Sequence, residues 1–456
     1  MNAPHTPSAA PAQAAPATKP LFATPDQIRA LAAQYPTPFH LYDEATLRAQ
    51  AQSLASAFAW NPGFREYYAV KACPNPAIID VLREYGCGLD CATGTELELA
   101  ERMGVAGADI MFSSNQTPAC DYAYATRLGA TINFDDFAHL DFYERNVGPL
   151  PREVSLRVNP GGDFEGANGI FDRPQDAKFG MPVADMQRAA ARLADAGVER
   201  IGLHALLCSN TLGNAYYPRL ARELFQMAAD LYRSRGVRIS FINLSGGVGI
   251  AYRPEDAMPD IAAIGAGVRQ AYEEVIVPSG LGDVSIYTEL GRFMTGPAGC
   301  LVTRVLHLKH TYHRYAGVDA CMADLMRPAL YGAYHHITVV PETDDPVRAA
   351  CDRSAVYTVV GGLCENNDRF ANDRLLPELH VGDLLVIHDT GAHGRSMGFQ
   401  YNGKLRHAEV LLQQDGSSRL IRRAETPQDY FATLDVLGGA FAAPVPAPAP
   451  APDARA

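Results

Sequence analysis

Short apolar segments recur along the chain at regular intervals, and most of the gaps between them carry apolar residues at helical spacing. Eight of these segments are rich in strand-forming residues, at positions 65–71, 88–93, 109–114, 131–135, 153–159, 200–207, 241–247 and 283–290. The intervening segments 216–236 and 261–277 are long and amphipathic, as expected of helices that cover a sheet. Eight alternating strands and helices predict an α/β fold, a (β/α)8 barrel, in preference to an open doubly wound sheet.

The pattern changes after residue 290, where helical spacing becomes scarce. Strand-like segments follow at 298–309, 355–360, 384–388 and 404–412. We therefore predict a C-terminal, mostly β domain of sandwich-like or barrel-like form. The predicted domains are an N-terminal segment that pairs with the β domain (21–42), the barrel (43–290) and the β domain (291–440). The Ala/Pro-rich ends, 1–20 and 441–456, are predicted to be disordered tails.

Composition narrows the class of protein. Hydrophobic residues make up 47% of the 456 residues, which is typical of a globular protein. A formal net charge of -12 argues against nucleic-acid binding, and no apolar run is long enough for a membrane span. The N-terminus lacks the basic and apolar regions of a signal peptide, and the nine cysteines include no CxxC pair. These features indicate reduced thiols and a cytoplasmic protein, with no metal site predicted.

Polar residues gather where the predicted barrel strands end, and this is where the working residues of such barrels lie. Lys71 closes the first apolar strand. A desolvated lysine there would lose its proton easily and act as a nucleophilic amine, although a strand-end lysine that reaches water is the commoner case for an isolated motif. The other candidates at strand ends are Asp90, Arg157, His204, Ser209 and Glu289.

A glycine cluster follows the seventh strand and predicts a phosphate site. Gly246, Gly247 and Gly249 would let backbone N–H groups approach an anion, and Gly291-Arg292 beside them adds a cation. A tight turn is the alternative for the glycines alone. A lysine, a phosphate site and the carboxylate of Glu289 together fit pyridoxal 5'-phosphate, whose ring nitrogen works best when an acid keeps it protonated.

Several further motifs complete a family pattern. They are Tyr68-Ala69-Val70-Lys71-Ala72, Leu156-Arg157-Val158-Asn159-Pro160, Lys178-Phe179-Gly180, Asn243-Leu244-Ser245-Gly246-Gly247, Glu289 to Arg292, Arg327-Pro328-Ala329-Leu330-Tyr331, Cys364-Glu365 and Tyr401-Asn402. With these motifs the chain resembles the pyridoxal-phosphate decarboxylases of alanine-racemase-type fold, and diaminopimelate decarboxylases in particular, over residues 35–435.

The resemblance implies roles for individual residues. Lys71 would hold the cofactor covalently, and Cys364 would return a proton to the carbanion left when carbon dioxide departs. Arg292, Arg327, Tyr331 and Glu365 would bind the substrate, with Glu365 on its distal ammonium. The predicted cofactor-binding residues are Lys71, Asp90, Arg157, His204, Ser209, Gly246, Gly247, Gly249, Glu289, Gly291, Arg292, His393 and Tyr401. The family's Cys-Glu pair comes from a second subunit, which implies a homodimer with shared active sites.

Three positions depart from the family pattern. Leu206 stands where a ring-stacking histidine is usual, His393 stands where a tyrosine is usual, and Glu289-Leu290-Gly291 replaces Glu-Pro-Gly. We predict decarboxylation of meso-diaminopimelate to L-lysine and carbon dioxide. The alternatives are a decarboxylase of another amino acid (ornithine, arginine, lysine or a D-amino acid), which the departures would accommodate, and an inactive homologue that still binds the cofactor. Retention of both Lys71 and Cys364 argues against the inactive homologue.

Overall fold

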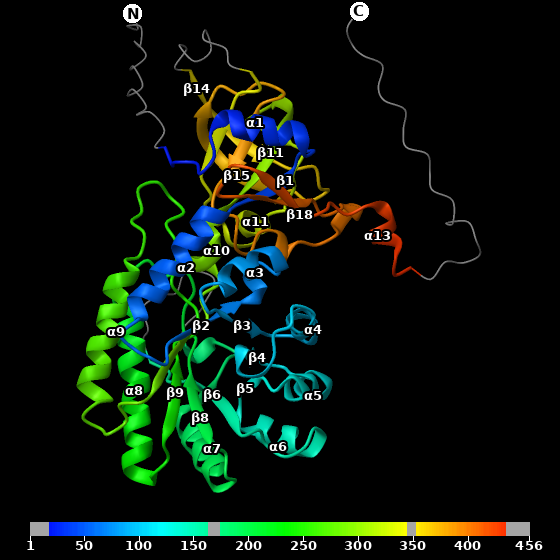
Figure 1. The fold of residues 1–456 in the computed structure, drawn as a ribbon. Helices are drawn as coiled ribbons and strands as arrows, with labels where there is room; N and C mark the ends of the chain where they lie inside the picture. Colours follow the sequence, from blue (N-terminus) through cyan, green and yellow to red (C-terminus); the bar gives the residue numbers. More distant parts are fainter. Residues whose placement is uncertain (1–17, 163–173, 344–352, 435–456) are drawn as a thin grey trace, which may run out of the picture.

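The computed structural model describes residues 18–162, 174–343 and 353–434 of the chain (Figure 1). Two bodies of structure lie one above the other. A parallel barrel surrounded by helices forms the lower body, and a mostly β body that includes the N-terminal helix forms the upper one. The predicted fold class is confirmed by this architecture.

Eight parallel strands close the barrel. In order around it they are β2 (Arg65–Ala69), β3 (Gly88–Cys91), β4 (Ile110–Ser113), β5 (Thr131–Phe134), β6 (Glu153–Asn159), β8 (Arg200–His204), β9 (Ile239–Asn243) and β10 (Ser285–Thr288). The barrel closes where β10 pairs with β2, with Tyr287 opposite Arg65. All eight overlap the apolar segments of the sequence, because buried parallel strands are apolar on both faces, although β9 begins two residues before the predicted segment and ends four residues before its end. The two-residue β7 (Met181–Pro182) pairs with the outer end of β6.

Helices cover the outside of the barrel. They are α2 (Glu44–Phe58), α3 (Pro76–Arg83), α4 (Gly94–Arg102), α5 (Ala119–Leu128), α6 (Phe137–Asn146), α7 (Val183–Asp195), α8 (Tyr216–Arg235) and α9 (Ile261–Val275). Side-chain caps fix where several of them begin. Asp43 accepts a hydrogen bond from the Thr46 amide at the start of α2, and Asn75 caps α3 with Pro76 in its first turn. The apolar faces of these helices pack with the strands into one core.

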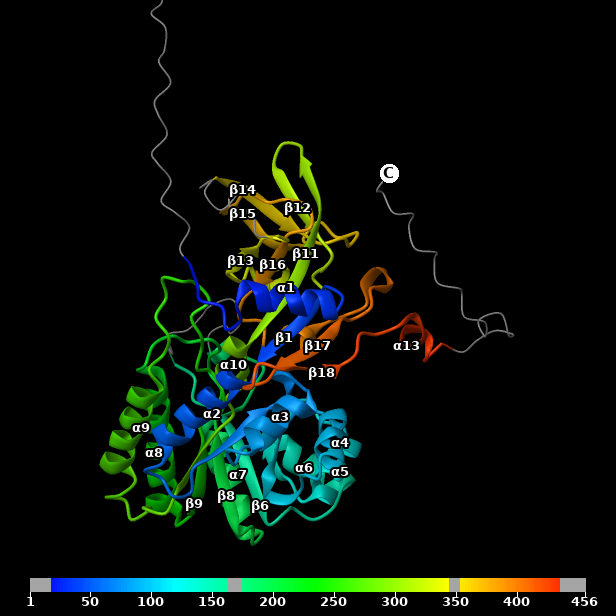
Figure 2. The ribbon, with the colours of Figure 1, turned by 45° about the horizontal axis from the view of Figure 1, so that its top comes forward.

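The upper body is built on a mixed sheet. Its strands are β1 (Phe39–Asp43), β11 (Gly299–His310), β12 (Arg314–Val318), β13 (Ile337–Val340), β14 (Ser354–Val360), β15 (Arg369–Pro377), β16 (Leu384–Ile387), β17 (Ala408–Leu412) and β18 (Ser418–Arg422). Short helices accompany them, at α1 (Pro25–Gln34), α11 (Arg327–Tyr331) and α13 (Pro427–Phe431). The helix α10 (Arg292–Thr295) follows the last barrel strand, and its Phe293 and Met294 belong to the barrel core. β1 comes from the N-terminal segment and lies between β11 and β17 (Figure 2).

The predicted tails fall largely outside the described residues, which exclude 1–17 and 435–456. Lys19, which the sequence placed within the first tail, is part of the described structure. Its amine donates to Asp389 in the upper body and to the carbonyl of Ala251 beside the barrel, each at 2.5 Å. The folded part therefore starts before the predicted boundary at residue 20. Among the described segments, no helix has the length and apolar character needed to cross a membrane.

Candidate active site

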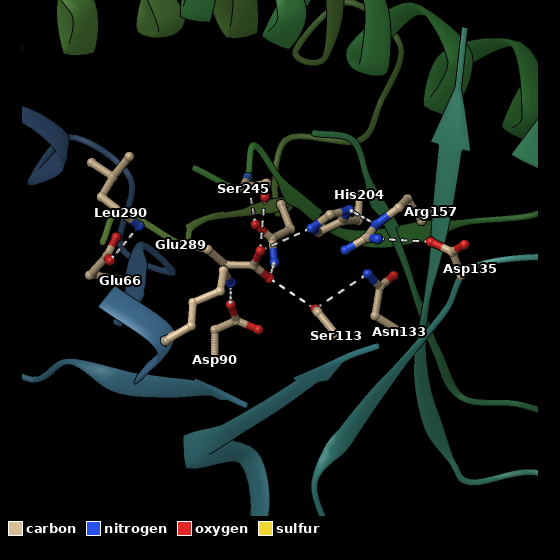
Figure 3. Close-up of polar contacts among 12 residues, drawn as sticks. Glu66, Asp90, Ser113, Asn133, Asp135, Arg157, His204, Ser245, Glu289 and Leu290 are labelled. Atoms are coloured by element: carbon tan, nitrogen blue, oxygen red, sulfur yellow. Dashed lines mark hydrogen bonds and ion pairs between the residues drawn. The ribbon is translucent and has the colours of Figure 1, made fainter. Parts of the chain in front are cut away.

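Lys71 lies at the mouth of the barrel in a single 3₁₀ turn, Val70–Ala72, directly after β2. Its Nζ donates to Oδ2 of Asp90 at 2.7 Å, and Asp90 is buried at the neighbouring strand β3 (Figure 3). Half of the lysine side chain is exposed, whereas the Asp90 side chain is fully covered. The amine therefore faces the open mouth of the barrel, and its partner forms part of the wall.

The charge state of this pair differs from the sequence-based expectation. The surrounding protein alone would lower the pKa of Lys71, but Asp90 and Glu289 outweigh this effect and raise it. Burial and the nearby Glu289 raise the pKa of Asp90 to about 7, against the opposing effect of Lys71. The expectation that desolvation gives Lys71 a low pKa is wrong, because the two carboxylates stabilise its ammonium form.

Glu289 follows β10, the strand next to β2, and is the centre of the hydrogen-bond network at the barrel mouth (Figure 3). Its Oε1 accepts from the Asn243 amide at 2.7 Å and lies 3.2 Å from the Ser113 hydroxyl. Its Oε2 accepts from the Ser245 hydroxyl at 2.9 Å and lies 3.0 Å from Nε2 of His204. Burial alone would raise the pKa of Glu289, but contact with His204 and the charges of Lys71 and Arg157 lower it to about 2.

A buried chain of polar contacts holds His204 in place. Nη1 of Arg157 pairs with Asp135 at 2.8 Å, and Nε of Arg157 donates to Nδ1 of His204 at 3.3 Å. Because Nδ1 accepts, the ring proton of a neutral His204 lies on Nε2 and points to Glu289. Burial lowers the pKa of His204, which keeps the ring neutral. The result is a fixed negative charge on Glu289, in contact with the side chains of Asn243, Ser113, Ser245 and His204.

The turn after β9 fits the role of an anion cradle. Ser245 and Gly247 have φ angles of 56° and 124°, and an added Cβ on Gly246 would lie 3.0 Å from the carbonyl oxygen of Glu289. The backbone N–H groups of Gly246 and Gly247 donate to no acceptor among the residues that the structure describes. The carbonyl of Gly247 accepts from Thr211, and Gly249 donates back to Thr211, just beyond the half-buried Ser209. This pairing fixes the turn against the loop that follows β8.

Two buried arginines meet on the ring of Tyr252. Nη1 of Arg292 donates to the Tyr252 hydroxyl at 2.5 Å, and the guanidinium carbon of Arg327 lies 4.5 Å from the ring centroid. Nη1 of Arg327 also lies 2.8 Å from Nε2 of His335, whose Nδ1 contacts the carbonyl of His388. Among the described residues, neither arginine pairs with a carboxylate. Burial lowers the pKa of Arg327.

Gly291 and His393 bring these groups next to the lysine turn. An added Cβ on Gly291 would lie 2.7 Å from Cβ of Ala72, so the strand end after β10 packs closely against the turn. The amide of His393 donates to the carbonyl of Ala72 at 2.9 Å. Burial lowers the pKa of His393, and the charges of Arg292, Arg327 and Lys71 lower it further. His393 therefore lies among the cations of the site, at φ 56°.

Four predicted residues are exposed at the surface, and of these Tyr331 lies near the arginine pair, at the end of the helix that begins with Arg327. Cys364 and Glu365 are exposed, and the Cys364 amide donates to the side chain of Asn402 at 2.7 Å. The Tyr401 hydroxyl contacts the Cys364 carbonyl at 3.5 Å, and half of Tyr401 is exposed. Tyr331, at the end of α11, is exposed as well. Within the described chain, no hydrogen bond or ion pair connects these four residues to Lys71 or Glu289.

Comparisons with known proteins decide the family. The model of a family described as "Pyridoxal-dependent decarboxylase, pyridoxal binding domain" matches residues 44–296. The chain belongs to this family.

Relatives extend the likeness of this decarboxylase beyond the barrel. Protein TabA of Pseudomonas amygdali pv. tabaci is 41% identical over 396 residues, which cover 87% of this chain and 90% of that protein. Diaminopimelate decarboxylase of Methanothermobacter thermautotrophicus is 33% identical over 401 residues, which cover 88% of this chain and 92% of that protein. The solved diaminopimelate decarboxylase of M. jannaschii in co-complex with L-lysine is 28% identical and has a TM-score of 0.81. The match covers 90% of this chain and 94% of that one. The protein is thus a pyridoxal-phosphate-dependent amino-acid decarboxylase.

The described residues fit pyridoxal phosphate. The N–H groups of Gly246 and Gly247 offer donors for a phosphate, and the absence of a side chain at Gly246 leaves room beside the Glu289 carbonyl. Oδ1 of Asp90 is buried without a hydrogen-bond partner in the described structure, next to the Lys71 amine. When bound, the cofactor supplies an electron sink for the electron pair that a departing carboxylate leaves behind.

The sequence did not single out several members of the site. Ser113 and Asp135 lie at or just after the ends of β4 and β5, and Asn243, which the sequence placed in a motif without a role, ends β9. The strand-end rule that selected Asp90 and Arg157 could have selected them too. Tyr252 and His335 lie in loops far apart in the sequence, and only the fold brings them to Arg327.

Proposed function

We propose that this decarboxylase converts meso-diaminopimelate to L-lysine and carbon dioxide. The observation that carries the proposal is the pair of buried guanidinium groups on Tyr252, neither of which has a carboxylate partner in the described structure. A buried charge is stable only when it is paired, so this pair fits two bound anions. The cofactor phosphate and the distal carboxylate of the substrate would be those anions.

The side chains divide the remaining work. Lys71 is the amine that would hold the cofactor, and the ionised Glu289 would lie beside the cofactor's ring nitrogen. Arg327 and Tyr331 would bind the distal carboxylate, because a guanidinium forks onto a carboxylate with two parallel hydrogen bonds. Glu365 would pair with the distal ammonium, and Cys364 Sγ would deliver the proton that replaces carbon dioxide.

Cys364 and Glu365 are exposed in this chain, so the proposal includes a second copy that supplies them. The site would then be completed at the contact between two chains, as a homodimer with two shared active sites. The relatives named diaminopimelate decarboxylase, at 33% identity, support the substrate.

A second candidate is decarboxylation of a different amino acid by the same machinery. His393 favours it, since an imidazole there stands among Lys71, Arg292 and Arg327 where the family resemblance leads one to expect a tyrosine. The relative that is 41% identical, Protein TabA, has a name that gives no substrate.

The test is carbon dioxide release by cofactor-loaded protein from meso-diaminopimelate, L-ornithine, L-lysine, L-arginine and D-lysine. We expect release from meso-diaminopimelate alone, and none from a Lys71→Ala variant. Arg327→Gln should raise KM for meso-diaminopimelate roughly 30-fold, as loss of a buried charged contact costs about 2 kcal/mol or more. Release from one of the other amino acids would overturn the substrate assignment and retain the decarboxylase.

A further inference from the structure

A cavity of about 300 Å³ lies between residues of α11, residues of β15 and Arg253, the residue after Tyr252. We refer to it as the arginine pocket. Its wall contains Arg253, Arg369 and Arg374 around Tyr334, with the amides of Asn367 and Asn372 beside them. Among the described residues that line it, none is acidic.

The charges of this pocket are not neutralised from within. The guanidinium carbons of Arg374 and Arg253 lie 4.0 Å and 4.3 Å from the centroid of the Tyr334 ring. Two guanidinium groups on one ring repel each other, and stacking leaves the N–H groups at their edges available to a ligand. Arg253 has only a loose contact of 3.8 Å with Glu255, at the surface. Arg369 and Arg374 form no ion pair within the described chain.

The available donors in the pocket are all suited to an oxyanion. Arg369 contacts only uncharged oxygens, those of Asn366 and Asn372. Three cations with a single loose carboxylate contact, that of Arg253 with Glu255, are unexpected in a chain that carries 51 acidic and 39 basic residues. A phosphate or carboxylate group would neutralise this cluster, because guanidinium groups bind both in bidentate fashion.

We propose that the arginine pocket is a second ligand site, which binds a small oxyanion of the phosphate or carboxylate class. A volume of about 300 Å³ suits a metabolite of a few heavy atoms rather than a nucleotide. The site is separate from the cofactor cradle at Gly246 and Gly247 and from the arginine pair on Tyr252.

The pocket is connected to Arg327 by two contacts. Nη1 of Arg374 donates to the carbonyl of His335 at 2.9 Å, and Nε2 of the same histidine lies 2.8 Å from Nη1 of Arg327. Ala329 in the pocket wall belongs to α11, the helix that begins with Arg327. An anion in the pocket would lower the positive potential at Arg327 and weaken its hold on a substrate carboxylate. This coupling rests on the proposed role of Arg327, whereas binding itself does not.

Titration calorimetry with inorganic phosphate and with succinate tests the binding. The cofactor-loaded protein is used, so that the cofactor's own phosphate fills the glycine turn. We expect one site per chain in the arginine pocket, in addition to the proposed carboxylate site at Arg327, and added potassium chloride should weaken it. Affinity should fall about tenfold or more in an Arg253→Gln/Arg369→Gln double variant, which leaves the Arg374 contact to His335 in place. Arg235→Gln, at the exposed end of α8, is the matched control and should bind as wild type does.

The outcomes are distinct. Binding of phosphate alone, or of both probes, with loss in the double variant supports the site and identifies its ligand class. Absence of binding to wild type, or equal affinity in the double variant with its cofactor absorbance and melting temperature intact, overturns it. In turnover assays, phosphate should raise KM for the substrate about fivefold with kcat unchanged. Binding without this KM change would overturn the coupling and retain the site.

Discussion

Two buried carboxyl groups, those of Glu66 and Glu289, lie close together at the junction of β2 and β10, and their surroundings push their pKa values apart. Burial raises the pKa of Glu66 well above its usual value, despite hydrogen bonds from Thr288 and the Leu290 amide. Glu289, in contact with His204 and near two cations, is held at about 2. This difference in pKa gives the two carboxyl groups different roles, because an ionised Glu289 can keep the cofactor's ring nitrogen protonated and a neutral Glu66 cannot. Glu66 instead holds the backbone next to Glu289 in place, because its Oε1 accepts a hydrogen bond from the backbone N–H of Leu290 at 2.7 Å.

The protonation of Glu66 predicts how stability depends on pH. The folded state holds a proton on Glu66 at pH values where the unfolded state has lost it, so wild-type stability falls as pH rises above about 4.5. Glu66→Gln cannot ionise, and its one amide oxygen can still accept from the Leu290 amide while its NH2 group donates to the Thr288 hydroxyl in the reverse direction. We therefore expect the variant to gain stability over wild type at pH 8, and to gain less at pH 5, in urea unfolding followed by circular dichroism.

Glu101→Gln provides the control of opposite sign. Glu101 is an exposed carboxylate whose pKa is lowered to about 2 by Arg127 and Tyr124, so its contribution to stability is present at neutral pH and lost in acid. Parallel stability curves for wild type and Glu66→Gln across this pH range would show that Glu66 is ionised in the folded protein.

At the scale of elements, sequence periodicity was sufficient for the barrel and insufficient for the upper sheet. The barrel strands are buried on both faces, so each is a continuous apolar run that the sequence displays. β15 contains Asn372, Asp373 and Arg374, and β18 reads Ser-Arg-Leu-Ile-Arg at the edge of its sheet. Partly exposed strands of this kind lack an apolar run, and their pairing depends on neighbours far away in the sequence.

The site residues that could be predicted are likewise those on or just after apolar barrel strands, and those that could not depend on contacts between distant parts of the sequence. Lys71, Asp90, Arg157, His204 and Glu289 follow or end apolar strands, and the barrel rule places such residues at one mouth. The arginine pair on Tyr252 depends on how α10 and α11 are placed in the fold. Arg292 begins α10 and Arg327 begins α11, and these two helices are separated in the sequence. No local pattern contains that arrangement.

The glycine turn after β9 supplies the prediction at this scale. Gly247→Ala should reduce cofactor affinity, because its φ of 124° is unfavourable to alanine and the added Cβ would lie 3.1 Å from the Cys208 carbonyl. Strain of this kind costs about 1–3 kcal/mol, so the dissociation constant should rise roughly 5-fold to 150-fold in equilibrium dialysis. Gly213→Ala is the matched control, since its Cβ would have a single neighbour, at 4.0 Å. Equal affinities of the two variants would contradict the cradle.

At the scale of the whole molecule, one chain holds the parts of the proposed reaction in two places. The lysine, the carboxylates and the arginine pair surround the barrel mouth, whereas Cys364 lies exposed on a loop held by Asn402 and Tyr401. Among the described residues, no hydrogen bond joins Cys364 to a residue of the barrel mouth, so the proposed function takes its proton donor from a second chain. A second chain resolves the difficulty, and two-fold symmetry would complete both sites at once.

Complementation between inactive variants tests this arrangement. Lys71→Ala removes the amine and Cys364→Ala removes the proton donor, so each should lose nearly all activity alone. If sites are shared, chains dissociated and reassociated at equal amounts form mixed dimers in about half of cases, each with one intact site. Activity should then recover to about a quarter of wild type, whereas variants mixed without subunit exchange should stay inactive. Cys120→Ala, which removes another exposed thiol, should leave activity intact. No recovery, with dimers present by size-exclusion chromatography, would show that each chain uses its own Cys364.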